Sequence, residues 1–304
     1  MFHRDKRNDY RFVLAKSLAQ TNHGKARYIN MIEITDKEFS QFSVYIKRNY
    51  GINLKTEKKL MFSGRLQNVL TDIGCESFSD YYEYVRSDSS GQAAITLIDK
   101  VTTNHTFFMR EADHFTFFQE KVLPYLKRSV QSKDLRIWCA ASSSGEEAYT
   151  LAMILDEYFG AEKLLWDKKI LATDISESVL DVATRGIYSN DRIKPLPTQW
   201  KQKYLKKYDS ENWVIHNSIK NEVIFRKFNL MEGFFPFRKK FNVIFCRNVL
   251  IYFDSETKDQ LIQKFYDALE VGGYLFLGHS ETINRFGSCF DYVMPSVYRK
   301  NRTT

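Results

Sequence analysis

The sequence predicts an α/β protein: a doubly wound, mainly parallel sheet preceded by a small all-helical domain and carrying a small β-subdomain insert. Three observations predict it. Apolar residues recur at helical spacing before about residue 97, strand-like and helix-like runs alternate after it, and a polar stretch with Pro195 and Pro197 interrupts that alternation. The expected parts are a basic N-terminal tail at 1–30, a helical domain at 31–97, and an α/β domain at 98–304 with the insert at about 188–221.

The helical domain begins with a capping box, because Thr35 and Glu38 have the S/T-x-x-E spacing that starts helices. Gly51 is expected to end this first helix. Three more helices are expected at 56–74, 77–87 and 91–102. A further helix at 115–130 contains Pro124, which predicts a kink.

The α/β domain is expected to alternate strands with helices. The strands are predicted at 136–141, 169–175, 222–230, 241–248 and 272–279, and the helices at 146–159, 176–187 and 255–269. Residues 211–225 suggest short antiparallel strands in or next to the insert. Ligands of such sheets bind beyond the carboxyl ends of the strands, so polar residues there are the candidates for a site.

Composition limits the class of protein. The net charge of +8 fits a nucleic acid, an acidic protein or an anionic membrane surface as partner, and equally a solvated basic surface. The four cysteines form no C-x-x-C pair, so we expect no metal. The absence of a long apolar run and of a secretory signal predicts a cytoplasmic protein with no membrane insertion.

The turn after the first strand raises a question about its ligand. The sequence AASSSG is followed by Glu146 and Glu147 at the start of a helix. Carboxylates favour helix N-termini for dipole reasons alone, but they would repel a phosphate. A cationic ligand without phosphate, such as S-adenosylmethionine, fits this turn, and small side chains let the backbone approach it.

Polar residues follow the other strands. Asp174 ends the second strand, where an acid can accept hydrogen bonds from ribose hydroxyls; its alternative role is to cap the next helix, which Ser176 can do instead. Asn229 and Leu230 suit an adenine edge and face, although that pair alone is uninformative. Arg247 and Asn248 interrupt an apolar run, where unpaired polar groups are costly.

These motifs occur in a fixed order: TTNHTFFMRE, SSSGEEAYTLAM, ATDIS, NL, FCRNVLIYF and GGYLFLGHSE. Together they resemble the chemotaxis receptor methyltransferases, the CheR family of protein-glutamate O-methyltransferases, over residues 31 to about 299. The resemblance implies a class I methyltransferase-like fold, S-adenosylmethionine as cofactor and S-adenosylhomocysteine as product. Family members often read GEEPYS where this chain has GEEAYT, so Ala148 lacks the proline favoured at a helix start.

The resemblance also assigns residues. It implies cofactor contacts by Asn104, Thr106, Arg110, Glu147, Asp174, Asn229, Leu230, Arg247 and Asn248. It places Arg110 and Tyr252 near the transferred methyl group. Without the resemblance, Arg110 and Glu111 could form a surface charge pair, and Tyr252 could be a core aromatic.

The implied partner is the cytoplasmic domain of methyl-accepting chemotaxis receptors, an acidic helical bundle. We expect Lys58, Lys59 and Arg65 to form a basic stripe that docks it; the alternative is a solvated face. The insert could bind a receptor peptide by strand addition. We expect a monomer that binds no nucleic acid; the alternatives are an S-adenosylmethionine-dependent RNA methyltransferase and a non-enzymatic receptor-binding module.

Overall fold

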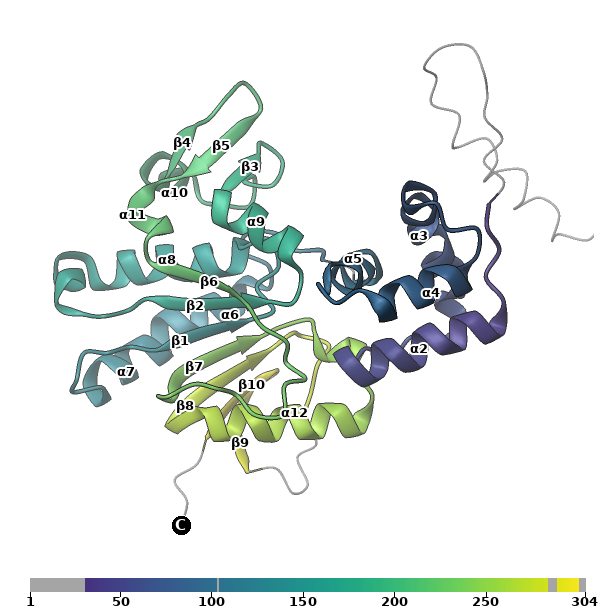
Figure 1. The fold of residues 1–304 in the computed structure, drawn as a ribbon. Coiled ribbons are helices and arrows are strands. Elements are labelled where there is room, and N and C mark those ends of the chain that lie inside the picture. Colours follow the sequence, from purple (N-terminus) through teal and green to yellow (C-terminus); the bar gives the residue numbers. More distant parts are fainter. Residues whose placement is uncertain (1–30, 103, 284–288, 301–304) are drawn as a thin grey trace, which may run out of the picture.

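The computed structural model describes residues 31–102, 104–283 and 289–300, and the expected basic tail at 1–30 lies outside them. The described chain forms an N-terminal helical domain beside a seven-stranded sheet, with a small second sheet set apart from the first (Figure 1). The predicted fold class is therefore confirmed. Within the described residues, no helix combines the length and apolar composition needed to cross a lipid bilayer.

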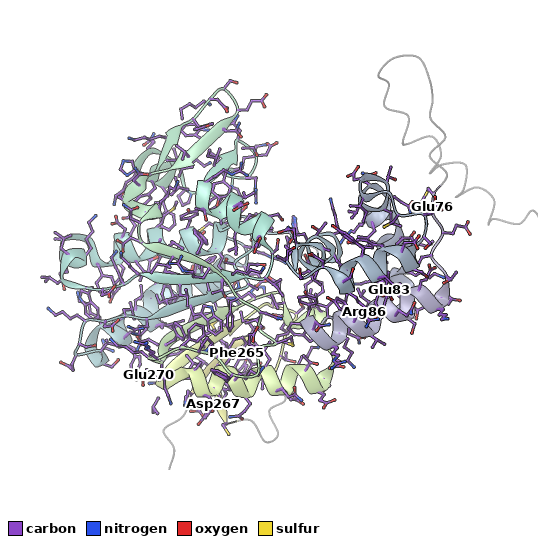
Figure 2. All side chains as sticks on the ribbon, in the orientation of Figure 1. Glu76, Glu83, Arg86, Phe265, Asp267 and Glu270 are labelled. Carbon is purple, nitrogen blue, oxygen red and sulfur yellow. The ribbon has the colours of Figure 1, made fainter. Side chains whose placement is uncertain are left out.

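The helical domain contains α2 (Asp36–Tyr50), the 3-10 turn η1 (Thr56–Lys58), α3 (Lys59–Ile73), α4 (Phe78–Ser87) and α5 (Gln92–Val101). The capping box forms as expected: the Thr35 hydroxyl accepts from the Glu38 amide at 3.2 Å, and the Glu38 carboxylate accepts from the Thr35 amide at 2.8 Å. Glu83 and Arg86 lie on the exposed side of α4 (Figure 2). Because α5 continues to Val101, the helices run past the expected boundary at residue 97.

The large sheet has the strand order β6-β2-β1-β7-β8-β10-β9. Its strands are β1 (Ile137–Ala140), β2 (Ile170–Asp174), β6 (Val223–Lys227), β7 (Phe241–Cys246), β8 (Leu269–Leu277), β9 (Phe290–Met294) and β10 (Val297–Lys300). The first five in that order are parallel, and β10 is antiparallel to both neighbours. The sequence analysis missed β9 and β10: β9 lies mostly exposed at the edge without apolar alternation, and β10 has only four residues.

Alternate residues of each central strand face two different cores. Trp138 of β1 packs toward Phe265 of α12 (Ser255–Ala268), with ring centroids 5.6 Å apart, and Phe265 lies against the sheet (Figure 2). Cys139 belongs to the opposite core. That side is covered by α6 (Ala112–Phe117), the π-helical η2 (Phe118–Val122), α7 (Leu123–Ser129) and α8 (Glu146–Phe159). The predicted break near Pro124 appears as η2, since proline cannot donate to a regular helical ladder.

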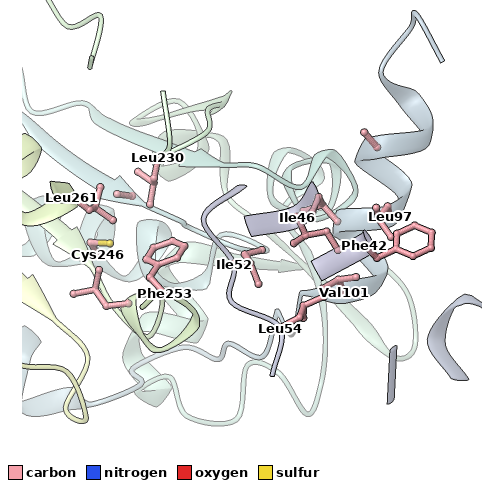
Figure 3. Close-up of a cluster of buried hydrophobic side chains, with 14 of the residues drawn as sticks. Phe42, Ile46, Ile52, Leu54, Leu97, Val101, Leu230, Cys246, Phe253 and Leu261 are labelled. Carbon is pink, nitrogen blue, oxygen red and sulfur yellow. The ribbon is translucent and has the colours of Figure 1, made fainter. Parts of the chain in front are cut away.

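The core on the α12 side continues into the helical domain. Phe42 and Leu97 of the helices, Ile52 and Leu54 of the segment after α2, and Phe253 near α12 belong to one buried cluster (Figure 3). Burial of this shared apolar surface holds the helical domain against the sheet.

The expected insert is present as a subdomain. It contains β3 (Ile187–Ser189), α10 (Thr198–Tyr204), β4 (Leu205–Lys207), β5 (Asn212–Ile215) and α11 (Asn217–Lys220). The strands form an antiparallel sheet of order β3-β5-β4. It follows α9 (Glu177–Arg185) and returns the chain to β6, as Figure 1 shows.

Candidate active site

A pocket opens at the carboxyl ends of β6, β2, β1 and β7. All of the cofactor residues expected from the sequence line it, together with Tyr252: Asn104, Thr106, Arg110, Glu147, Asp174, Asn229, Leu230, Arg247 and Asn248. The helical domain adds Tyr50, Ile52 and Thr102, which the sequence analysis did not single out. The fold thus brings six separated segments to one cavity.

The two consecutive glutamates after β1 have different surroundings. Glu146 is fully buried and pairs with Arg192 of the insert region. Glu147 lines the pocket, where it accepts from Arg247 Nη1 at 2.6 Å and from the Cys139 thiol at 3.0 Å. Only Glu147 is therefore placed to meet a cationic ligand.

The turn before α8 is formed by small residues with left-handed backbone. Ala141 and Ser143 have φ angles of 64° and 49°, and Gly145 has a φ of 95°. A Cβ on Gly145 would lie 2.9 Å from the Ala183 Cβ, so this glycine is required by packing against α9 as well as by its φ angle. The turn places Ser143 against the pocket.

Asp174 is buried at the tip of β2. Its carboxylate accepts from the Ser143 amide at 2.8 Å and the Ser176 amide at 3.0 Å. Burial raises the pKa of Asp174 above its ordinary value, and the amide hydrogen bonds oppose that rise. Ser176 caps α9, accepting from the Val179 amide, so Asp174 is not needed as that cap. Its position fits a ligand with hydroxyl donors.

Arg247 and Asn248 follow β7 and share one partner that the sequence analysis passed over. The Arg247 guanidinium lies between Glu147 and Glu111 with 2% of its side chain exposed. Burial would lower the pKa of Arg247, but both carboxylates raise it. Asn248 Nδ2 donates to Glu111 at 3.1 Å. This shared partner is Glu111, which the sequence analysis considers only as a surface charge partner of Arg110.

Arg110 and Tyr252 reach the pocket from different elements. Arg110 Nη1 donates to the His105 carbonyl at 2.7 Å. Tyr252 ends the short helix η4 (Leu250–Tyr252), and its carbonyl accepts from the Asn53 amide at 2.8 Å. The helical domain therefore contacts the segment that carries Tyr252.

The wall beyond β6 is largely apolar. Phe228 and Leu230 after β6 and Ile175 after β2 line it, which suits the face of a planar ring. The amide of Asn229 is engaged: its Nδ2 donates to the Asn49 carbonyl at 2.9 Å, and its Oδ1 accepts from the Met231 amide at 3.0 Å. Asn229 thus links this wall to α2.

The three basic residues expected to dock a partner do not share one environment. Lys59 pairs with Asp36 at 2.6 Å. Arg65 Nη1 donates to the carbonyls at the end of α5, including that of Val101 at 3.0 Å. Lys58 is exposed, and its Nζ lies 5.6 Å from the centroid of the Tyr252 ring. Arg65 Nη1 also donates to the carbonyl of Thr102 at 3.2 Å, so Lys58 and Arg65 each lie next to a residue that lines the pocket.

One cluster has metal-ligand chemistry. Side-chain atoms of Glu111, His114 and His279 lie within 4.8 Å of one another. Glu111 already accepts from Arg247 Nη2 at 2.9 Å, and that cation opposes the binding of a second one. We therefore assign no metal to the cluster.

Known proteins resemble the chain along nearly all of the described residues. The profile described as "CheR methyltransferase, SAM binding domain" matches residues 104–298, and "CheR methyltransferase, all-alpha domain" matches residues 37–102. A "Chemotaxis protein methyltransferase" of Borreliella burgdorferi is 44% identical over 273 residues, 89% of this chain and 96% of that protein. "Chemotaxis protein methyltransferase Cher2" of Pseudomonas putida is 33% identical over 250 residues, which are 81% of this chain and 90% of that protein.

Proposed function

This chain belongs to the CheR methyltransferase family, and from that premise we propose that it methylates glutamate side chains of chemotaxis receptors. The methyl group would come from S-adenosylmethionine, and the product would be a glutamate methyl ester. Methyl transfer in chemotaxis follows from the family itself. The glutamate acceptor, the receptor and the roles of individual residues are the proposal.

The observation that carries the proposal is the order of polar groups along the strand ends. The sheet order β6-β2-β1-β7 places Leu230, Asp174, Glu147 and Arg247 in succession along one pocket. An apolar wall, a ribose-binding acid and a carboxylate beside an arginine match adenine, ribose and amino acid in that sequence.

The residues present fit S-adenosylmethionine. Its ammonium and sulfonium favour a carboxylate, which Glu147 offers, and its ribose hydroxyls can donate to Asp174. The turn after β1 presents no lysine or arginine of the kind that holds phosphate. When bound, the cofactor would supply an activated methyl group, and the residues of the chain would bind and orient the two reactants.

We propose that the chain acts mainly by positioning. A glutamate carboxylate is ionised at neutral pH, with an ordinary pKa of about 4.3, so the reaction needs no general base. Arg110 would orient the acceptor carboxylate or the amino-acid end of the cofactor. Tyr252 would border the reacting centre and donate a hydrogen bond. Correct placement of the reactants can lower the barrier by several kcal/mol.

We propose that receptor docking uses the face of the helical domain that contains Lys58. Its exposed ammonium beside Tyr252 would meet an acidic receptor helix next to the reacting centre. Lys59 and Arg65 would contribute mainly through long-range attraction, because their contacts are with Asp36 and the end of α5. We propose a monomer acting on receptor cytoplasmic domains without a metal or nucleic acid.

The test is methyl transfer from labelled S-adenosylmethionine to receptor-rich membranes, with cellular RNA supplied in a parallel reaction. Base-labile label on the receptor supports the proposal. Label on RNA with none on protein would establish the RNA methyltransferase instead. Binding of receptor without any transfer would indicate a non-enzymatic module.

A further inference from the structure

We propose that Glu111 is a positioning residue that orients Arg247 and Asn248 for the amino-acid end of the methyl donor. This assignment rests on the proposed function, which places adenosine toward β6 and the amino acid toward β7. It gives Glu111 a role in the binding of one half of the cofactor only.

The hydrogen bonds that the Glu111 carboxylate accepts come from the end of β7 and from the segment after β8. Its carboxylate accepts from Arg247 Nη2 at 2.9 Å, from Asn248 Nδ2 at 3.1 Å and from the His279 amide at 3.2 Å. Burial would raise the pKa of Glu111, but Asn248 and Arg247 lower it below its ordinary value. The group is therefore an anion whose two oxygens hold both cofactor-site side chains.

The local contact of the Glu111 carboxylate, 3.7 Å from Nδ1 of His114 on α6, is too long for a hydrogen bond and does not explain this arrangement. It occupies the cap position of α6 with a φ of 56°, yet its side chain makes no capping hydrogen bond to that helix. A non-glycine residue in the left-handed region is strained, and such strain persists where surrounding contacts fix it. The side chain instead crosses to β7.

Asn248 is held by a second set of contacts, which shows how tightly this corner is specified. Its φ angle is 61°, and its backbone N–H donates to the buried Glu281 carboxylate at 2.9 Å. Gly278 must be a glycine here, because an added Cβ would lie 2.8 Å from the Asn248 amide nitrogen. Glu281 thus fixes the backbone of Asn248, and Glu111 fixes its side chain.

Arg247 also connects this corner to the backbone of Arg110. Arg247 Nη2 also donates to the Arg110 carbonyl, so the guanidinium joins the segment before α6 to the end of β7. Glu147 holds the other end of that guanidinium at 2.6 Å. Loss of Glu111 would leave Arg247 with Glu147 and the Arg110 carbonyl as partners and would remove the carboxylate that accepts from the Asn248 side chain.

The experiment compares Glu111→Gln with Asp113→Asn. Each change removes one carboxylate charge from the same short segment, but Asp113 is exposed and pairs only with His279 Nε2 at 3.0 Å among the described residues. Calorimetry would measure S-adenosylmethionine and 5′-methylthioadenosine, which lacks the amino-acid end. We expect Glu111→Gln to bind S-adenosylmethionine about 10- to 100-fold more weakly, as for lost hydrogen bonds to charged groups. Its affinity for methylthioadenosine, and both affinities of Asp113→Asn, should stay within about twofold of wild type.

Three results would overturn the assignment. Glu111→Gln could keep wild-type affinity for S-adenosylmethionine, it could lose both ligands equally, or Asp113→Asn could show the same selective loss. If thermal melting shows Glu111→Gln unfolded, Glu111→Asp is measured by the same criteria, since its shorter side chain cannot reach both partners. Wild-type protein that binds neither ligand would refute the proposed function itself.

Discussion

His114→Phe should make the protein less sensitive to acid. His114 has no exposed surface, and neither ring nitrogen finds a hydrogen-bond partner among the described residues. Burial, with a contribution from the charge of Arg247, lowers the pKa of His114 to about 4. The folded state therefore holds the neutral ring, while the unfolded chain takes up a proton near its ordinary pKa of about 6.5.

The difference between the folded and unfolded pKa of His114 determines how the free energy of unfolding changes with pH. As pH falls from about 6.5 to about 4, the unfolded state binds a proton that the folded state refuses, so the free energy of unfolding decreases. At pH 4.5 the loss amounts to about 2–3 kcal/mol relative to pH 7.5, taking about 1.36 kcal/mol for each unit of difference. Phenylalanine has no such proton, and its ring can replace the packing of His114 on Phe276.

Urea unfolding followed by circular dichroism at pH 7.5 and 4.5 would measure the effect. Protonation of carboxylates destabilises both proteins alike and cancels in the difference between them. Between pH 7.5 and 4.5 we expect the free energy of unfolding of His114→Phe to fall by about 2–3 kcal/mol less than that of wild type. Parallel stability curves for the two proteins would refute a buried, neutral His114.

Three further predictions concern the site. Asp174→Asn should weaken S-adenosylmethionine binding by about 1–3 kcal/mol in calorimetry, through loss of a charge-assisted hydrogen bond; unchanged affinity removes Asp174 from the site. Arg110→Ala should lower kcat at saturating receptor while receptor pull-down persists; an unchanged kcat excludes it from the reacting centre. Reversing Lys58 and Lys59 to Glu should raise the KM for receptor about fivefold or more at low salt and less at high salt; a KM like that of wild type at low salt would make this face a solvated surface.

Sequence reasoning selected residues that line one pocket because they stand at strand ends. Asp174 and Arg247 are polar residues in apolar runs, and parallel strands deliver their carboxyl ends to one edge of the sheet. The pattern could not separate Glu146 from Glu147, since both favour a helix N-terminus. In the fold, Glu146 is fully buried and paired with Arg192, whereas Glu147 lines the pocket beside Arg247.

Other features depend on contacts between segments far apart in the sequence. Glu111 reaches Asn248 across 137 positions, and nothing local to Glu111 indicates that partner. Arg65 is one of several charges on a helix by sequence, but in the fold it donates to the carbonyls at the end of α5. A residue's type predicts its chemistry, whereas its partner depends on how distant segments of the chain pack together.

Mass spectrometry of receptor peptides after reaction with S-adenosylmethionine tests the central claim most directly. The account predicts that specific glutamate side chains gain one methyl group, that mild alkali removes it, and that Arg110→Ala protein leaves those peptides largely unmodified. Methylation confined to lysine, arginine or RNA, or a modification that resists alkali, would contradict a glutamate methyl ester as the product.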